Sequence, residues 1–184
     1  MLLDDLYNGV RHTPSDIAEH LEMLSRLSSL CEHVTEFGVR AGNSTIALLY
    51  GRPRALVSYD VLPCLRAEEL EVAAKEAGVH FLFKQESSLS ADIEETDLLF
   101  IDTLHTFKQL TVELRNHSAK VRRFIAFHDT TTFGDRDEQP VPPGNYEAAG
   151  LWAAISRFLK SDADWSLKFY LTNNNGLTVI ERGH

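Results

Sequence analysis

The chain has 184 residues, of which 43% are hydrophobic, which suffices for one domain with a well-buried core but is short for two. Its formal net charge is −9 and its 18 Lys and Arg residues are scattered, which argues against a nucleic-acid surface. The N-terminus lacks the basic and apolar regions of a signal peptide, no run is long enough to span a bilayer, and the two cysteines lack CxxC spacing, so we expect a cytoplasmic protein without a membrane segment.

Apolar periodicity predicts an N-terminal helical segment over residues 1–32. Thr13 is the expected N-cap of the first helix and Pro14 its first residue, because Thr can satisfy free N–H groups and Pro is tolerated in the first turn. The apolar residues of this helix are Ile17, Leu21, Leu24, Leu27 and Leu30.

Beyond this segment, strands and helices alternate. The strands are expected over residues 33–39, 55–61, 79–84, 96–102 and 124–127, and the helices after Gly42 and over residues 66–77, 107–121 and 146–159. Two final strands, 166–172 and 177–181, are separated by Asn173-Asn-Asn-Gly176, and the Asn-Gly pair is typical of an antiparallel hairpin. The alternation predicts a single α/β domain with a doubly wound, Rossmann-like sheet.

A long segment over residues 130–145 interrupts the alternation. It directly follows the polar pair His128-Asp129 and contains three prolines together with Gly134, Asp135, Asp137 and Glu138. Loops of this length in a compact domain are usually functional or disordered. We therefore expect a substrate loop or lid here.

The first strand runs into a glycine loop, Glu36-Phe-Gly38-Val-Arg-Ala-Gly42-Asn-Ser44. Glycines at a strand-to-helix turn let the backbone approach a ligand beside a helix N-terminus, where free N–H groups attract anions. Asp60 ends the second strand, 18 residues past Gly42, where a carboxylate can accept hydrogen bonds from both hydroxyls of a ribose. Together these features predict a site for an adenosine-type cofactor. Taken separately, each has a structural alternative: a glycine turn without a ligand, and Asp60 as a helix cap.

The spacing of the glycine loop differs from the GxGxxG of dinucleotide enzymes and resembles motif I of class I S-adenosylmethionine-dependent methyltransferases. The resemblance implies S-adenosylmethionine as cofactor, with Glu36 near its amino-acid end and Asp60 on its ribose. It also implies adenine contacts at Gln85-Glu-Ser87 and a seven-stranded sheet of order 3-2-1-4-5-7-6 that ends in an antiparallel hairpin. The cofactor-binding candidates are Glu36, Gly38, Gly42, Ser44, Asp60, Ser87 and Asp102.

Polar side chains also follow the fourth and fifth strands, as Asp102-Thr-Leu-His105 and His128-Asp129. Buried parallel strands deliver their C-terminal residues to the edge where open α/β sheets bind ligands. If the two strands are neighbours, two carboxylates and two imidazoles could hold a divalent metal and leave a base for proton transfer. The alternative is that Asp102 caps the next helix, with His105 in its first turn. The remaining internal histidines are expected to be surface or structural residues: His12, His20, His33, His80 and His117.

These two motifs resemble those of a methyltransferase subgroup that includes macrocin-type sugar O-methyltransferases and cephalosporin-hydroxylase-like proteins. The resemblance implies Asp102, His128 and Asp129 as metal ligands, and His105 as the catalytic base beside Asp102. His128 stands where the pattern has Glu, and imidazole suits Zn, Mn or Fe better than Mg. Mg, Mn and Zn therefore all stay open, as do a supporting role for His128 and a site without any metal.

The sequence thus predicts an S-adenosylmethionine-dependent methyltransferase that acts on a hydroxyl of a small molecule, such as a sugar or natural-product intermediate, with or without a metal. The acceptor must lose its proton as its oxygen attacks the methyl group, and both a metal and a histidine can assist that step. We expect a small-molecule acceptor, neither nucleic acid nor membrane as partner, and leave a homo-oligomer open. Two alternatives are an NAD-linked oxidoreductase and a cofactor-binding module without turnover.

Overall fold

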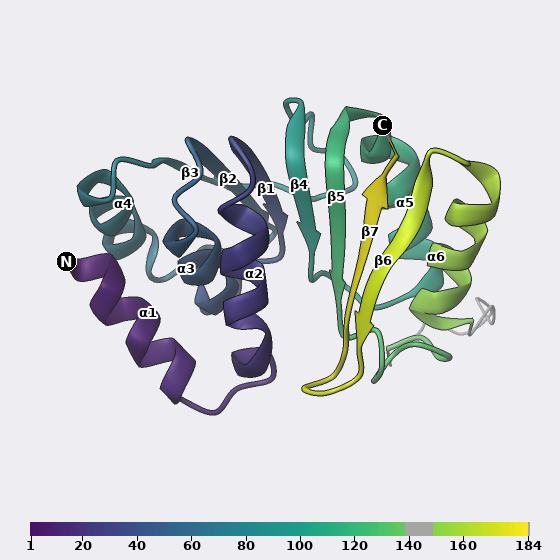
Figure 1. Ribbon diagram of the computed structural model, residues 1–184, viewed down its shortest axis with the longest axis horizontal. Coiled ribbons are helices and arrows are strands. Elements are labelled where there is room, and N and C mark those ends of the chain that lie inside the picture. The colour runs from purple at the N-terminus through teal and green to yellow at the C-terminus, as the bar shows by residue number, and fades with distance from the viewer. Residues whose placement is uncertain (139–148, 184) are drawn as a thin grey trace.

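The computed structural model describes residues 1–138 and 149–183, which form one seven-stranded sheet with helices on both faces (Figure 1). The strands are β1 (His33–Phe37), β2 (Ala55–Asp60), β3 (His80–Gln85), β4 (Thr96–Ile101), β5 (Val121–His128), β6 (Trp165–Leu171) and β7 (Leu177–Arg182). Their order is β3-β2-β1-β4-β5-β7-β6, and β7 is antiparallel to both of its neighbours. The predicted fold, strand order and terminal hairpin are confirmed.

The described helices agree with the expected alternation from residue 43 onward. They are α1 (Leu2–His12), α2 (Leu21–Ser28), α3 (Asn43–Tyr50), α4 (Ala67–Glu76), α5 (Phe107–His117) and α6 (Gly150–Ser161), with short 3-10 turns at Ala18–His20 and Ser118–Lys120. None of the described helices is long and apolar enough to span a membrane.

The prediction of a helix starting at Thr13 is wrong. Thr13 follows the end of α1, and its hydroxyl donates to the carbonyl of Gly9 at 2.8 Å. α1 forms because Leu3 and Tyr7, four residues apart, lie on one face and are both buried. Of the apolar residues expected in that helix, Ile17 lies in the connection between α1 and α2, and Leu21, Leu24 and Leu27 lie in α2.

Each strand of the central sheet divides its side chains between two cores. Val34, Phe100 and Ala126 pack on the face that α1, α2, α3 and α4 cover. Leu99 and Ile125 pack on the opposite face, against α5 and α6 (Figure 1). Because β1 and β4 are buried along their whole length, only the residues at their ends can reach a ligand.

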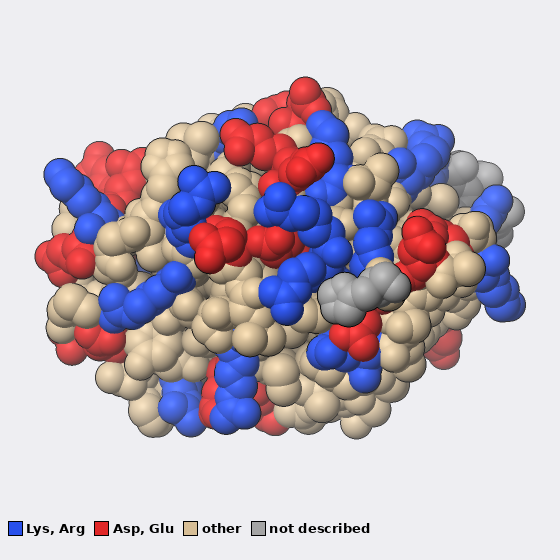
Figure 2. Space-filling model, turned by 45° about the horizontal axis from the view of Figure 1, so that its top comes forward, with Lys and Arg blue, Asp and Glu red and all other residues tan. Residues whose placement is uncertain are grey.

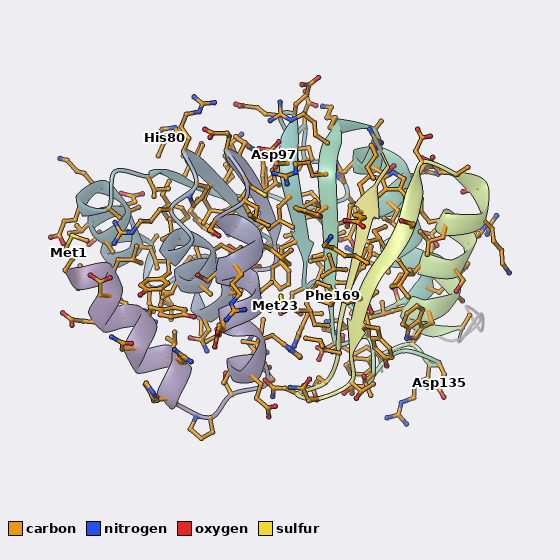
Figure 3. The ribbon with its side chains drawn as sticks, in the orientation of Figure 1. Met1, Met23, His80, Asp97, Asp135 and Phe169 are labelled. Carbon is orange, nitrogen blue, oxygen red and sulfur yellow. The ribbon has the colours of Figure 1, made fainter. Side chains whose placement is uncertain are left out.

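The two edges of the sheet carry different chemistry. Asp97 marks the amino-terminal edge of the parallel strands and Asp135 the opposite side of the molecule (Figure 3). Asp97 accepts hydrogen bonds from the backbone N–H groups of Glu32 and His33 and from Arg122 at 2.9 Å. Figure 2 looks onto this edge, where Lys and Arg interleave with Asp and Glu, so this face offers no continuous basic surface.

Candidate active site

A cavity of about 500 Å³ lies at the carboxyl edge of the parallel strands. Its walls come from the segments that follow β1, β2, β3 and β4, the arrangement in which open α/β sheets bind ligands. The predicted site residues that line it are Gly38, Ser44, Asp60, Ser87, Asp102 and His105. Glu36, Gly42, His128 and Asp129 do not line this cavity.

The glycine loop passes very close to the end of β4. Gly38 has φ +88°, and a Cβ atom placed on it would lie 1.9 Å from the carbonyl oxygen of Asp102. Gly42 has φ +78° and directly precedes α3, so it supplies the turn into the helix without lining the cavity. Glycine is needed at both positions, and at Gly38 the reason is space as well as backbone conformation.

Asp60 is not a helix cap, because α4 begins only at Ala67. Its Oδ2 accepts hydrogen bonds from the backbone N–H groups of Val39 at 2.8 Å and Arg40 at 3.0 Å. Its Oδ1 accepts from Leu62 at 2.9 Å. A carboxylate has about four acceptor positions, so Asp60 shapes the glycine loop and can still accept a hydroxyl from the cavity.

Glu36 lies beneath the glycine loop and has no exposed surface. Its carboxylate accepts hydrogen bonds from three hydroxyls, those of Ser44 (2.6 Å), Thr45 (2.8 Å) and Ser58 (2.6 Å). The structure therefore places Glu36 behind Ser44, which does line the cavity. Burial outweighs these hydrogen bonds and raises the pKa of Glu36 to about 7.

The Glu36→Gln variant should lose the pH dependence of stability that we expect for the wild-type protein. Between its usual pKa near 4.5 and about 7, Glu36 binds a proton in the folded state and not in the unfolded state, so stability falls as pH rises across this window. The full effect is about 3 kcal/mol. Urea unfolding at pH 5 and pH 8 measures it, and equal pH dependence in variant and wild type would refute the assignment.

A second buried carboxylate, Glu113 of α5, was not predicted from the sequence. One of its oxygens accepts hydrogen bonds from Ser88 (2.6 Å), Thr103 (2.8 Å) and Gln109 (2.8 Å), which all line the cavity. Glu113 thus joins the segments after β3 and β4 to α5. The available signal was its place on the apolar face of a helix, between Leu110 and Leu114.

The polar ends of β4 and β5 come together, as the sequence predicts. His105 Nε2 lies 3.1 Å from Asp102 Oδ1 and 3.1 Å from Asp129 Oδ2. Asp102 does not cap α5, because the N-cap is Thr106, whose hydroxyl accepts from Gln109 N–H at 3.1 Å. The carboxylates of Asp102 and Asp129 are therefore free to act in the site.

Glu138, which was not predicted as a site residue from the sequence, holds the other side of His105. Glu138 Oε2 lies 2.9 Å from His105 Nδ1 and also accepts from the His105 backbone N–H at 3.2 Å. The ring of Phe133 stacks on His105 with centroids 5.0 Å apart. The described part of the predicted loop, residues 130–138, thus packs on the site, and the rest of that prediction lies outside the described residues.

The charges around His105 set its protonation state. Burial lowers its pKa, but the hydrogen bond and charge of Asp102, with Asp129 and Glu138, outweigh burial and raise the pKa to about 9. Burial would raise the pKa of Asp102, but the hydrogen bond from His105 and the charges of His105 and His128 bring it well below its usual range. Without another cation, His105 is therefore protonated at neutral pH.

Asp102, His128 and Asp129, hereafter the metal-donor group, present one donor atom each within 4.8 Å of one another. His128 is 2% exposed, and neither of its nitrogens has a hydrogen-bond partner among the described residues. Asp129 Oδ1 is likewise buried and unpartnered, on a residue with φ +59°. Unpartnered buried acceptors are costly, so this donor set fits a divalent cation.

A scan against models of known protein families finds no match for this sequence. A search of curated proteins also finds no match.

Solved structures match the fold over nearly its whole length. An O-methyltransferase from Bacillus cereus in complex with SAH has a TM-score of 0.67 at 14% identity, and the match covers 98% of this chain and 90% of that one. The N-methyltransferase NodS from Bradyrhizobium japonicum with S-adenosyl-L-homocysteine has a TM-score of 0.64 at 16% identity, covering 100% and 99%. The O-methyltransferase TomG from Streptomyces achromogenes with SAM has a TM-score of 0.58 at 18% identity, covering 100% and 90%. The chain therefore has the fold of class I S-adenosylmethionine-dependent methyltransferases.

Proposed function

We propose that the protein is an S-adenosylmethionine-dependent methyltransferase that transfers the methyl group to a hydroxyl of a small molecule. The observation that carries this proposal is that the glycine loop and Asp60 line the same cavity as Asp102 and His105. The solved structures with the same fold include methyltransferases bound to SAM or SAH. The cavity thus offers a cofactor side and an acceptor side in one space.

On the cofactor side, a ribose hydroxyl donates to the acceptor position of Asp60 that the backbone N–H groups leave open, and the backbone of Gly38 lies along the cofactor. Ser87 and Leu89 line the cavity after β3, and Val61 and Leu62 line it after β2. Leu62 and Val61 are 66% and 62% exposed, so a flat adenine ring packed against them would bury apolar surface that is otherwise in water.

On the acceptor side, Asp102, His128 and Asp129 are the residues that would hold a divalent cation. When bound, the cation lowers the pKa of the acceptor hydroxyl and offsets the two negative charges that raise the pKa of His105. The nitrogen ligand favours Mn or Zn over Mg.

In the proposed reaction His105 receives the acceptor proton at Nε2. Glu138 accepts the Nδ1–H hydrogen bond, so it fixes the tautomer with its lone pair on Nε2. Attack of the acceptor oxygen on the methyl carbon forms the new C–O bond as the S–CH₃ bond breaks, and S-adenosylhomocysteine leaves.

The charge of the cavity favours an uncharged or cationic acceptor. Five acidic residues line it: Asp16, Asp60, Glu86, Asp102 and Glu138. Arg40 is the only Lys or Arg among the described lining residues. Its guanidinium already pairs with Asp16 at 2.6 Å. A phosphorylated or carboxylated acceptor would meet repulsion here, whereas a polyol or a phenol would not.

Calorimetry of the wild-type protein and an Asp60→Asn variant tests the cofactor assignment. We expect wild type to bind S-adenosylhomocysteine and not NAD, and Asp60→Asn to bind it about 10- to 100-fold more weakly, since a hydrogen bond to a charged group contributes about 1.5–3 kcal/mol. Glu86→Gln removes one charge from the same cavity and serves as the control. Binding of NAD alone would favour the oxidoreductase.

Methyl transfer is then measured with hydroxylated acceptors and their phosphorylated forms, in the presence of Mg²⁺, Mn²⁺ or Zn²⁺. We expect turnover of uncharged acceptors only. Binding of S-adenosylhomocysteine without turnover of any acceptor would favour the cofactor-binding module.

A further inference from the structure

The turn between β6 and β7 makes more contacts than a hairpin needs. Asn174, Asn175 and Gly176 have φ of +42°, +72° and +97°, which explains why Asn and Gly occupy the turn. The side chains of Asn173 and Asn174 nevertheless leave the hairpin: Asn173 Nδ2 donates to Glu19 at 2.6 Å, and Asn174 Oδ1 accepts from Glu19 N–H at 2.9 Å. Turn geometry does not require these bonds, which tie the turn to the segment between α1 and α2.

The same turn also holds the segment that follows Asp129. The carbonyl of Asn175 accepts from the backbone N–H groups of Thr131 at 2.7 Å and Thr132 at 3.1 Å. A Cβ atom on Gly176 would lie 2.4 Å from the Thr131 nitrogen, so the approach is as close as a glycine allows. The turn is therefore bound both to the segment between α1 and α2 and to the segment that follows Asp129 of the metal-donor group.

His20 lies at the centre of this arrangement, with no exposed surface. Its Nε2 is 2.9 Å from the carbonyl oxygen of Asn173. A carbonyl only accepts, so Nε2 carries the proton and donates, which fixes the tautomer of His20. The His20 ring meets the His128 ring edge to face, with centroids 5.5 Å apart and planes at 73°.

Among the described residues, none forms a hydrogen bond with His128 that would orient its ring. Its Nδ1 lies 3.6 Å from Asp102 and 3.5 Å from Asp129, distances longer than those of good hydrogen bonds. The ring orientation of a metal-binding histidine is normally set by a partner outside the ligand set. Here the neighbouring ring that is itself fixed by a hydrogen bond is that of His20.

We propose that His20 is a positioning residue for His128, and that the Asn173 carbonyl holds His20 in the orientation that sets the metal-donor group. This inference rests on the proposed function, because it gives His128 a role in the acceptor side of the site. Neither His20 nor Asn173 lines the cofactor cavity. Loss of His20 should therefore weaken the metal-donor group and leave cofactor binding unchanged.

Two variants separate the aromatic ring of His20 from its hydrogen bond to Asn173. His20→Phe keeps an aromatic ring but cannot donate to the Asn173 carbonyl, and His20→Gln keeps a donor but removes the ring. The matched control is His12→Gln, which changes an exposed histidine at the end of α1. Folding is checked by circular dichroism, and one folded variant is sufficient for the test.

Three quantities are measured: the imidazole ¹⁵N resonances of His128, the affinity for Mn²⁺ and the affinity for S-adenosylhomocysteine. We expect the His128 resonances to move and Mn²⁺ affinity to fall about 10- to 100-fold, the usual effect of removing a residue that supports a metal ligand. S-adenosylhomocysteine affinity should stay within about threefold of wild type because the cofactor cavity is untouched. The His12→Gln control should match wild type in all three.

Wild-type His128 resonances in the folded His20 variants, together with unchanged Mn²⁺ affinity, would overturn the proposal. If the wild-type protein binds no Mn²⁺, the His128 resonances decide alone. If it binds no S-adenosylhomocysteine, the proposed function fails, while the resonances still show whether His20 sets His128.

Discussion

The Gly38→Ala variant is expected to lose S-adenosylhomocysteine binding and about 2–5 kcal/mol of unfolding free energy. An alanine with positive φ costs about 1–2 kcal/mol. Overpacking adds a further cost of about 1–3 kcal/mol, because the new Cβ would lie 1.9 Å from the backbone oxygen of Asp102 and β1 and β4 would have to separate. That separation would displace the glycine loop and Asp102 together, so both sides of the cavity change.

Gly78→Ala is the matched control, because Gly78 has φ +75° and no atom of the described residues lies within 4 Å of the position of an added Cβ. It should show only the backbone cost and bind S-adenosylhomocysteine as wild type does. Urea unfolding and calorimetry of the two variants give the comparison. Equal losses at both positions would show that the contact between Gly38 and Asp102 does not matter.

The His105→Gln variant is expected to lose about 10² to 10⁴ in the rate of methyl transfer, the usual contribution of a general base. Under the proposed function, glutamine removes the group that would take the acceptor proton. The cofactor side of the cavity is unchanged, so affinity for S-adenosylhomocysteine should stay within about threefold of wild type. Single-turnover kinetics and calorimetry separate the two effects.

His80→Gln changes an exposed histidine at the start of β3, far along the strand from the site, and should retain full activity. A His105→Gln variant with wild-type turnover would show that His105 is not the base. Loss of cofactor affinity would instead assign His105 a role in holding the cavity together.

The centre of the sheet could be predicted from the sequence because its strands are buried and therefore form continuous apolar runs, as in Leu98–Ile101. The Asn-Gly pair before β7 supplied the direction of the last strands. Within the helical segment over residues 1–32, the first helix is expected to start at Thr13 because the Thr13-Pro14 pair is a strong start signal, but here the pair follows the end of α1 rather than opening a helix. Local signals such as this pair carry no information about which helix end they serve.

The part of the site that lies at the ends of β4 and β5 could be predicted from the sequence, and His105 contacts Asp102 and Asp129 as expected. The roles of these residues in catalysis stay predictions. Glu138 and His20 were not identified because they reach the site through contacts between distant segments. Glu36 was expected along the cofactor and lies beneath the loop, since its three hydroxyl partners come from α3 and β2.

The contact between His20 and the Asn173 carbonyl has a consequence for how the protein is made. The two residues are 153 positions apart, so a ribosome must synthesise nearly the whole domain before His20 finds its acceptor. Such distant contacts form late in folding. A nascent chain that has completed β1 to β5 already holds the residues proposed for the cofactor side, whereas the contact between His20 and Asn173 can form only after the last hairpin has been synthesised. If His20 positions His128 as proposed, the proposed acceptor side would be completed only after the residues of the proposed cofactor side have all been synthesised.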